Sequence, residues 1–367
     1  MKVFHCDHCE QLVFFENTNC LNCGHVLAYV PELSDVRSLE SSGDGLWKSL
    51  PGKAGEHDAW RLCANYSTGN ICNWVLRDDD PNPLCLSCRL THIIPNLSLP
   101  NNKDAWCRLE TAKRRLIYTL LDLRLPLTGK ADHPEEGVAF LFLGDEGGQA
   151  VPFLSGHENG VITINIAEAD DAERERRRTD LHEPYRTILG HFRHEIGHYY
   201  WDRLIKGSDR LSAFRELFGD ETQDYGQALK RHYEQGAPAD FQQRFVTAYA
   251  SAHPWEDWAE TWAHYLHMSD ALQTAASTGL VLRPRDSAEP TVSHAMLKES
   301  AEGSFDRMLD AWFPLTYVIN NLNRGLGLAD GYPFVLSPPV VEKLRFIHET
   351  IAQAAAANMP EAAAKSA

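Results

Sequence analysis

Residues 189–204 read LGHFRHEIGHYYWDRL and contain two histidines, His194 and His198, with Glu195 directly after the first. Apolar and aromatic residues recur at helical spacing through this stretch, which predicts an α-helix that begins near Pro184. The histidines are one helical turn apart, so both imidazoles can face one metal ion. Glu195 projects roughly 100° around the helix axis from His194. The pattern is typical of zinc peptidases, in which the glutamate meets a water molecule.

Two histidines are an incomplete catalytic site, because catalytic zinc usually takes three protein ligands and leaves one position for water. The commonest extended motif has a third histidine six residues after the second, but Leu204 stands there. The stretch 249–268, YASAHPWEDWAETWAHYLHM, predicts a second helix that begins at Pro254 and buries its tryptophans. Glu256 and Glu260 lie one turn apart in this helix. They can supply a ligand and a carboxylate that supports a ligand, or both can be solvated acids.

Eight of the 9 cysteines fall into two groups of four. The first group consists of two C-x-x-C pairs, and at this spacing two knuckles present four thiolates to one tetrahedral Zn²⁺. The second group has one such pair and two more distant cysteines, for which a redox pair or buried free thiols are the alternatives to a second zinc site. The expected structural zinc ligands are Cys6, Cys9, Cys20 and Cys23 in the first site, and Cys63, Cys72, Cys85 and Cys88 in the second. Cys107 is expected to be a buried core thiol.

Length, charge and composition restrict the class of protein. The chain has 367 residues, of which 43% are hydrophobic, and a formal net charge of −16, as expected for a globular protein. The charge argues against a surface that binds nucleic acid, and Lys2 is the one basic residue before residue 31. The sequence shows no membrane span and no secretion signal, so we expect a cytoplasmic protein that contacts neither membrane nor nucleic acid. A partner at the cysteine groups is expected to be a protein.

The sequence predicts two small zinc modules, at 1–31 and 58–98, followed by a large domain at 101–350. Residues 32–57 are rich in Ser, Gly and Asp and are expected to form a linker. The Ala-rich segment 351–367 is expected to be a flexible tail.

Hydrophobic patterns locate the main elements of the large domain. They predict a helix over 102–124 and strands over 137–144 and 160–170. The second strand alternates apolar and polar residues, so it is expected to be half-exposed and able to accept an extended peptide as an additional strand. The charged run at 170–180 is expected to be a solvated loop. From residue 184 onward the pattern is almost entirely helical.

Tyr249 and the run EDWAE (256–260), which follow HEIGH at long distance, resemble the catalytic half of lethal-factor-type gluzincins. That group combines HExxH with a distant helix of the form Glu-aromatic-aromatic-Ala-Glu, and a tyrosine lies seven residues before the first glutamate. The resemblance implies that Glu256 is the third zinc ligand, that Glu260 supports a ligand and that Tyr249 donates to the developing oxyanion. Asp257 stands where the group has an aromatic residue, and a shifted register would make Glu260 the ligand instead.

The whole chain also resembles a bacterial family named for zinc-binding metallopeptidases with an N-terminal zinc ribbon. The resemblance spans about residues 6–340 and is carried by CNWVL, LCLSCRL, AKRRLIY, FRHEIGHYYWD, HPWEDWAETWAHYLH and GYPFVLS. It implies an α+β protein with a mostly helical, zincin-like catalytic domain and small zinc-ribbon modules. The implied metal content is one catalytic and two structural zinc ions.

These observations predict a zinc peptidase that acts on a peptide or protein. Glu195 is expected to take a proton from the zinc-activated water and to pass it to the leaving amine, while Tyr249 stabilises the oxyanion. The alternative is an inactive regulator or adaptor that uses the same fold to bind a protein, although zinc coordination alone does not require Glu195. His191, His264 and His267 are expected to be surface or packing residues.

Overall fold

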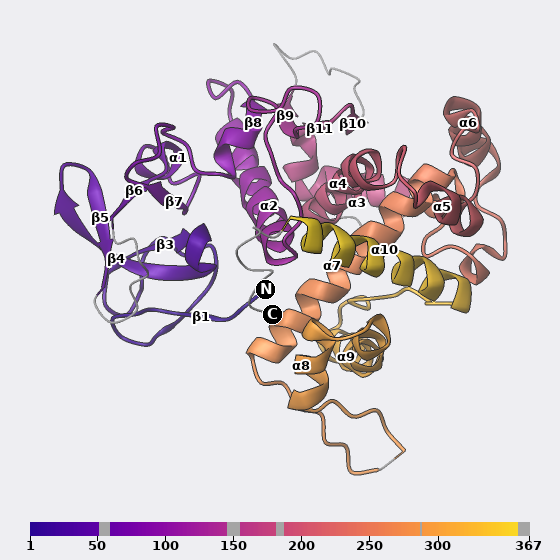
Figure 1. Ribbon diagram of the computed structural model, residues 1–367. Coiled ribbons are helices and arrows are strands. Elements are labelled where there is room, and N and C mark those ends of the chain that lie inside the picture. Colours follow the sequence, from indigo (N-terminus) through magenta and orange to yellow (C-terminus); the bar gives the residue numbers. More distant parts are fainter. Residues whose placement is uncertain (51–58, 145–154, 181–186, 287, 359–367) are drawn as a thin grey trace. The chain divides into compact units, whose positions relative to one another are not determined.

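A computed structural model describes residues 1–50, 59–144, 155–180, 187–286 and 288–358. The chain forms two compact units. The N-terminal unit consists of Val3–Asp122 and Leu127–Arg174, and the C-terminal unit of Met1–Lys2, Leu123–Pro126 and Glu175–Ala367. The protein is α+β, with a zinc-ribbon-like region at its N-terminus and a helical C-terminal domain (Figure 1). Among the described residues, no helix is both long and apolar enough to cross a membrane.

The elements have the following bounds. The described strands are β1 (Phe4–His5), β2 (Leu12–Val13), β3 (Val26–Val30), β4 (Asp35–Gly43), β5 (Leu46–Ser49), β6 (Ala59–Leu62), β7 (Val75–Arg77), β8 (Thr91–Ile93), β9 (Ala139–Leu143), β10 (Gly156–Glu158) and β11 (Val161–Asn165). The described α-helices are α1 (Ala64–Ser67), α2 (Asn102–Asp122), α3 (Asp171–Asp180), α4 (Ile188–Leu204), α5 (Leu211–Phe218), α6 (Tyr225–Gln235), α7 (Pro254–Ser277), α8 (His294–Glu302), α9 (Phe305–Gly325) and α10 (Pro338–Ala357).

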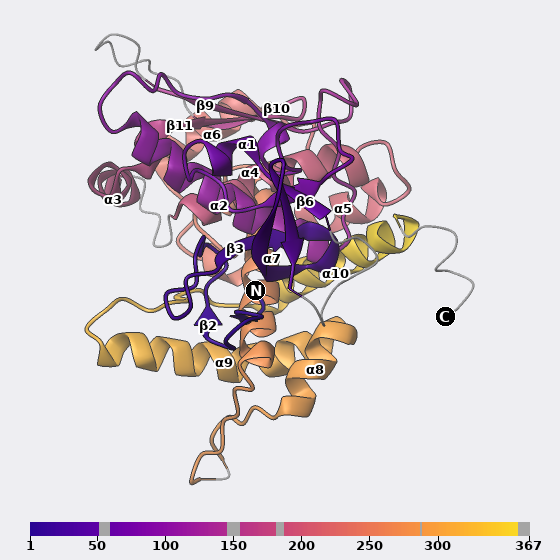
Figure 2. The ribbon, with the colours of Figure 1, turned by 90° about the vertical axis from the view of Figure 1, so that its left-hand side faces the viewer.

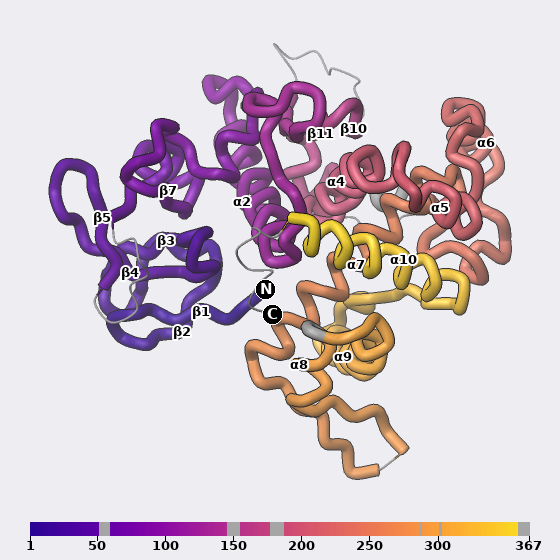
Figure 3. Tube along the Cα trace, viewed as in Figure 1, coloured from indigo at the N-terminus to yellow at the C-terminus, as the bar shows by residue number. Residues whose placement is uncertain are grey.

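β3 to β7 form an antiparallel sheet in chain order within the N-terminal unit (Figure 3). β4 and β5 occupy most of the expected linker, so that expectation is wrong for residues 35–49, while 51–58 lie outside the described residues. Asp44 and Gly45 explain the error. Their φ angles are +52° and +75°, the backbone of a two-residue hairpin turn. Turn residues are small and polar, so the composition of a hairpin resembles that of a linker.

The second sheet of the N-terminal unit has the strand order β10-β11-β9-β8. β11 is parallel to β9 and antiparallel to β10, and β9 is parallel to β8. The predicted strands at 137–144 and 160–170 correspond to β9 and β11, which are shorter. β11 is hydrogen-bonded to a neighbour on each side, so the expectation that it accepts a peptide strand is wrong. Within the described residues the edges of this sheet are β10 and β8.

The charged run at 170–180 forms the helix α3 instead of the expected loop. The Asp170 side chain caps its start by accepting a hydrogen bond from the backbone N–H of Glu173 at 2.8 Å. Arg174 forms an ion pair with Asp171, one turn earlier in the helix. Capping and this ion pair stabilise a helix that has almost no apolar side chains.

α2 confirms the predicted helix over 102–124 and ends at Asp122. Its Tyr118 packs against Phe15 and Tyr29, with ring centroids 5.5 and 5.9 Å apart. The ring of Trp74, from the second cysteine module, lies 4.7 Å from that of Tyr29. Both cysteine modules therefore share one aromatic core with α2, instead of folding as separate modules joined by a linker.

In the C-terminal unit, α4 and α7 pack tightly at Gly197. A Cβ atom on Gly197 would lie 3.1 Å from the Cα of Ala259 and 3.2 Å from the Cβ of Trp262. The indole Nε1 of Trp258 donates a hydrogen bond to the carbonyl oxygen of Gly197 at 2.8 Å. Glycine thus allows a close approach that a side chain would prevent. This contact brings the HEIGH and EDWAE segments together.

The remaining described residues of the C-terminal unit form helices joined by loops. α8 and α9 lie side by side in both views (Figures 1 and 2). Two 3-10 turns, Phe241–Gln243 and Tyr249–Ser251, replace a continuous helix before α7. α10 continues to Ala357, and its Ile351 and Ala354 are buried, so the expected flexible tail is wrong over 351–357. Residues 359–367 lie outside the described part of the chain.

Candidate metal centre

α4 carries both histidines of HEIGH. It begins after Thr187, whose side chain accepts a hydrogen bond from the backbone N–H of Gly190 at 2.9 Å, while the expected start at Pro184 lies outside the described residues. The Nε2 atoms of His194 and His198 lie 3.2 Å apart. The two imidazoles therefore converge on one point, as a separation of one helical turn allows.

α7 brings two carboxylates to these histidines. Oε2 of Glu256 lies 3.0 Å from Nε2 of His194 and 3.6 Å from Nε2 of His198. Oε1 of Glu260 lies 2.6 Å from Nδ1 of His194, and its Oε2 accepts a hydrogen bond from the hydroxyl of Thr247 at 2.7 Å. Glu256 therefore faces the nitrogens on which the histidines converge, whereas Glu260 contacts the opposite nitrogen of His194.

The donor chemistry of these groups fits a metal ion. Ligand atoms of His194, His198 and Glu256 all lie within 4.8 Å of one another. Oε2 of Glu256 is buried and receives no hydrogen bond from the part of the chain that the structure describes. A buried carboxylate oxygen is costly without a positive partner. Two imidazoles and one carboxylate are a known ligand set of catalytic zinc, which keeps a fourth position open for water.

The electrostatics of the centre favour a cation. Burial disfavours the protonated form of His194, but the carboxylates of Glu256 and Glu260 outweigh burial and hold the pKa of His194 well above its usual value. Burial likewise disfavours the charged form of Glu256, but His198 and His194 outweigh it, and the pKa of Glu256 lies well below its usual value. A metal ion binding here displaces a proton, so its affinity depends on pH.

Glu195 is buried on α4, with 5% of its surface exposed. Its Oε1 lies 3.1 Å from Nε2 of His191, and its Oε2 is buried without a hydrogen-bond partner among the described residues. Burial acts to raise the pKa of Glu195, but His191 and the histidines of HEIGH outweigh burial and lower it. Glu195 is therefore an anion with one fixed oxygen and one free oxygen, which is the form that a general base requires.

The three remaining histidines of α4 and α7 differ in their surroundings. His191 contacts Glu195, a contact that the expectation of a surface or packing residue did not include. His264 is buried and its Nδ1 lies 2.8 Å from a tyrosine hydroxyl, and His267 pairs with Arg193. Both are packing residues. A signal for His191 was present in the sequence, because a separation of four residues puts it on the same helix face as Glu195.

Two tyrosines flank the centre. The half-buried ring of Tyr249 lies 5.9 Å from the ring of His194. Burial, reinforced by the charge of Glu256, raises the pKa of Tyr249 well above its usual value, so its hydroxyl keeps its proton. Tyr225, the first residue of α6, donates a hydrogen bond to Oε1 of Glu256 at 2.5 Å. Nothing in the sequence pointed to Tyr225, because no spacing rule connects the start of α6 to either motif.

Asp257 replaces an aromatic residue of the lethal-factor-type pattern, and its partner lies on another helix. Its Oδ2 is 2.6 Å from Nζ of Lys343 on α10, and both side chains are buried. Burial outweighs the lysine and raises the pKa of Asp257 to about 7. Asp257 is therefore part of the contact between α7 and α10. Its neighbour Glu256 is the residue that faces the histidines.

The cysteines form two clusters in the N-terminal unit. Ligand atoms lie within 4.8 Å of one another in each cluster, which are Cys6, Cys9, Cys20 and Cys23, and Cys63, Cys72, Cys85 and Cys88. Representative Sγ–Sγ distances are 3.5 Å for Cys6–Cys23 and 3.7 Å for Cys72–Cys85. All eight thiols are free of disulfides, and the second cluster is entirely buried. Both arrangements fit a closed, four-thiolate structural zinc site.

Cys107 and His25 also lie in the N-terminal unit, and neither belongs to a cluster of four cysteines. Cys107 is only partly buried, so the expectation of a buried core thiol is wrong. His25 lies with its Nδ1 3.3 Å from Sγ of Cys23, and its ring stacks on His8 at 4.1 Å. His25 is therefore close enough to the first cluster to donate a hydrogen bond to a thiolate.

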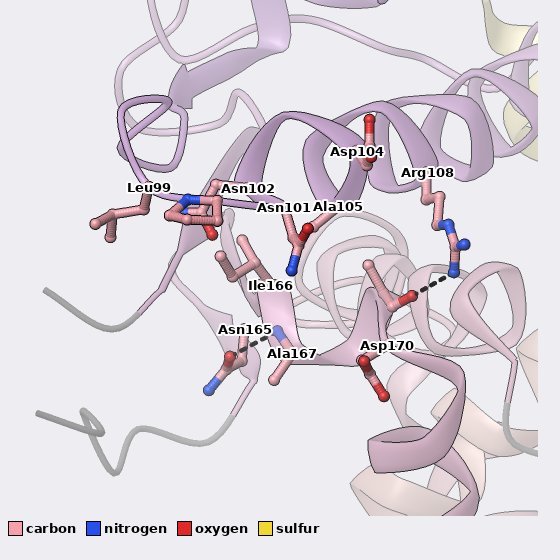
Figure 4. Close-up of a pocket in the computed structure, with 12 residues that line it drawn as sticks. Leu99, Asn101, Asn102, Asp104, Ala105, Arg108, Asn165, Ile166, Ala167 and Asp170 are labelled. Carbon is pink, nitrogen blue, oxygen red and sulfur yellow. Dashed lines mark hydrogen bonds between the residues drawn. The ribbon is translucent and has the colours of Figure 1, made fainter. Parts of the chain in front are cut away.

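The N-terminal unit also has a pocket of about 570 Å³ at the start of α2 (Figure 4). Arg108 donates a hydrogen bond to the carbonyl oxygen of Ala169 at 3.0 Å, and the Asn165 side chain accepts one from the N–H of Ala167 at 3.0 Å. None of the residues predicted for the metal centre lines this pocket.

Comparison with known proteins identifies the family. Residues 102–350 match the model of a family described as "Putative zinc-binding metallo-peptidase", and residues 3–99 match a zinc-ribbon domain. The chain belongs to this metallopeptidase family. Uncharacterized proteins of Mycobacterium bovis and of two Mycobacterium tuberculosis strains are each 44% identical to it over 356 residues, 97% of this chain and 96% of each relative. No solved structure matches the chain.

Membership in a zinc-binding metallopeptidase family agrees with the side-chain clusters of this chain. The zinc-ribbon match contains both cysteine clusters, and the metallopeptidase match contains His194, His198 and Glu256. Zinc is accordingly the metal that the family and the cysteine clusters together indicate.

Proposed function

We propose that the protein is a zinc-dependent peptidase in which His194, His198 and Glu256 hold the catalytic zinc and Glu195 is the general base. One observation carries the proposal: among the described residues, the buried Oε2 of Glu195 has no hydrogen-bond partner, and it lies one residue from His194, whose Nε2 converges with Nε2 of His198 and Oε2 of Glu256. A buried charged oxygen without a partner is costly, and it persists where a ligand or a reacting group completes its surroundings.

The proposed chemistry is the hydrolysis of a peptide bond. Zinc in this site would polarise the scissile carbonyl and lower the pKa of a water molecule. Oε2 of Glu195 takes the proton of the attacking water and later delivers it to the leaving amine. Meanwhile Oε1 stays fixed by His191, which orients the carboxylate. The hydroxyl of Tyr249 donates a hydrogen bond to the carbonyl oxygen as negative charge develops there.

Glu195→Gln tests this function, because it removes the proton acceptor and keeps the size of the side chain. We expect the wild type to cleave members of a broad peptide library and the variant to cleave none, with zinc content unchanged. Glu256→Ala is the companion variant and should instead lose the catalytic zinc. A wild-type protein that carries all its zinc and cleaves no library member would favour the non-enzymatic regulator. Equal cleavage by Glu195→Gln would remove Glu195 from the mechanism.

A further inference from the structure

We infer that Tyr225 is a positioning residue that holds Glu256 so that only one of its oxygens faces the metal. The inference rests on the proposed function, because it takes Glu256 as the third zinc ligand. The hydroxyl of Tyr225 donates to Oε1 of Glu256 at 2.5 Å, and Oε2 lies 3.0 Å from Nε2 of His194. Oε1 is thus held by the tyrosine, while Oε2 faces the imidazoles. If the carboxylate rotated so that both of its oxygens bound the metal, the hydrogen bond from Tyr225 would break.

The number of oxygens that Glu256 offers matters for catalysis. A carboxylate bound through both oxygens takes up space in the coordination shell that a peptidase needs for water and substrate. Glu256 has 1% of its surface exposed, so bulk water does little to hold its carboxylate while Tyr225 is in place. Partners that orient a metal ligand in this way typically change metal affinity or activity by about 10–100-fold.

The start of α6 is tied to the start of α7, which fixes Tyr225 in place. Nε2 of His253 lies 3.2 Å from the carbonyl oxygen of Gln223, and Nδ1 of the same imidazole accepts a hydrogen bond from the N–H of Trp255 at 3.1 Å. One histidine therefore caps α7 and holds the residues before α6. The ring of Tyr225 lies 5.3 Å from that of His253 and 5.9 Å from that of Trp255.

The way α6 is stabilised argues against a purely structural role for the Tyr225 hydroxyl. Of the residues of α6, Ala228 is the buried one, and Tyr225 itself is 37% exposed. The Asp224 side chain caps the helix by accepting a hydrogen bond from the N–H of Gln227 at 2.9 Å. The helix start is thus stabilised independently of the tyrosine hydroxyl. The hydroxyl can be removed without removing the cap.

Zinc affinity of Tyr225→Phe tests the inference without reference to peptidase activity. Zinc is removed from the His/His/Glu site of the full chain with a mild chelator and returned in competition with an indicator of known affinity. We expect zinc to bind about 10–100-fold more weakly than to the wild type, with zinc in the cysteine sites unchanged. Tyr317→Phe is the matched control, because Tyr317 is 55% exposed on α9, and it should keep wild-type affinity. An affinity of Tyr225→Phe within about twofold of wild type overturns the inference.

A double-mutant cycle with Glu256→Gln shows whether Tyr225 acts through the carboxylate. If it does, Tyr225→Phe weakens zinc binding in the wild type but adds little in the Glu256→Gln background. An equal loss in both backgrounds overturns the inference. This outcome is distinguishable from a failure of the proposed function, since peptide cleavage by the wild type and by Glu195→Gln is measured separately from zinc affinity.

Discussion

His194 has a carboxylate near each of its ring nitrogens. Glu260 lies 2.6 Å from Nδ1, and Glu256 lies 3.0 Å from Nε2. A proton on Nδ1 satisfies the hydrogen bond to Glu260 and leaves the Nε2 lone pair for a metal ion. Thr247 donates to the second oxygen of Glu260 and so fixes that carboxylate. We propose on this basis that Glu260 acts through His194 and that Glu256 is the ligand.

Tyr249→Phe is the residue-scale test of the mechanism. In the proposed function the Tyr249 hydroxyl stabilises the oxyanion, and the loss of such a donor typically lowers kcat by about 10²–10³-fold, or ~3–4 kcal/mol. Phenylalanine keeps the ring beside His194, so zinc content and Tm should stay close to wild type. KM should change less than kcat, because the hydrogen bond strengthens mainly in the transition state. Steady-state kinetics on any cleaved peptide measure both values. An unchanged kcat would contradict this role of Tyr249.

At the scale of elements, the packing of α4 on α7 determines which side chains meet. Gly197→Ala should destabilise the protein, because the new Cβ would lie 3.1 Å from the Cα of Ala259. Overpacking costs about 1–3 kcal/mol, and the better helix propensity of alanine returns only about 1 kcal/mol. The free energy of unfolding should therefore fall by about 1 kcal/mol, as measured by denaturant titration.

Gly226→Ala is the matched control for this variant. Gly226 is also helical, and its nearest contact for an added Cβ is 3.6 Å, an ordinary van der Waals distance. The control should therefore be neutral or slightly stabilising. If Gly197→Ala were as stable as Gly226→Ala, the close approach of α4 and α7 would not depend on glycine.

At the scale of the whole molecule, we expect three zinc ions per chain, two in the cysteine clusters and one in the His/His/Glu centre. The catalytic ion should leave first under mild chelation, because its fourth position is open to solvent, whereas four thiolates enclose each structural ion. Elemental analysis of protein purified without added metal measures the count, and timed chelation gives the order of release. One ion or none in a protein that remains folded would contradict both structural sites.

Stronger chelation should unfold the N-terminal unit, which follows from how that unit is built. The two cysteine modules share an aromatic core in which Phe15 and Tyr29 contact each other and both contact Trp74 and Tyr118. Loss of structural zinc removes a constraint from both modules at once, since metal binding and folding are coupled in such small units.

Short-range patterns in the sequence were sufficient for a large part of this protein. The spacing of His194 and His198 predicted their convergence, because one helical turn fixes the separation of two side chains. The C-x-x-C pairs predicted the first cysteine cluster for a similar reason, since both thiols of a pair lie on one tight turn. The family resemblance predicted an α+β protein with an N-terminal zinc-ribbon region and a helical C-terminal part. The helix α2 followed from local periodicity.

Only the tertiary structure decided the features that depend on distant partners. Glu256 and Glu260 lie on one face of a helix, so spacing alone could not separate their roles. The packing of α7 against α4, with Trp258 hydrogen-bonded to Gly197, turns Glu256 toward the Nε2 atoms and Glu260 toward Nδ1. Tyr225 had no signal in the sequence, because its contact with Glu256 depends on how α6 meets α7. Strand pairing also decided that residues 35–49 form β4 and β5 instead of a linker, since the composition of a hairpin does not show that its strands pair.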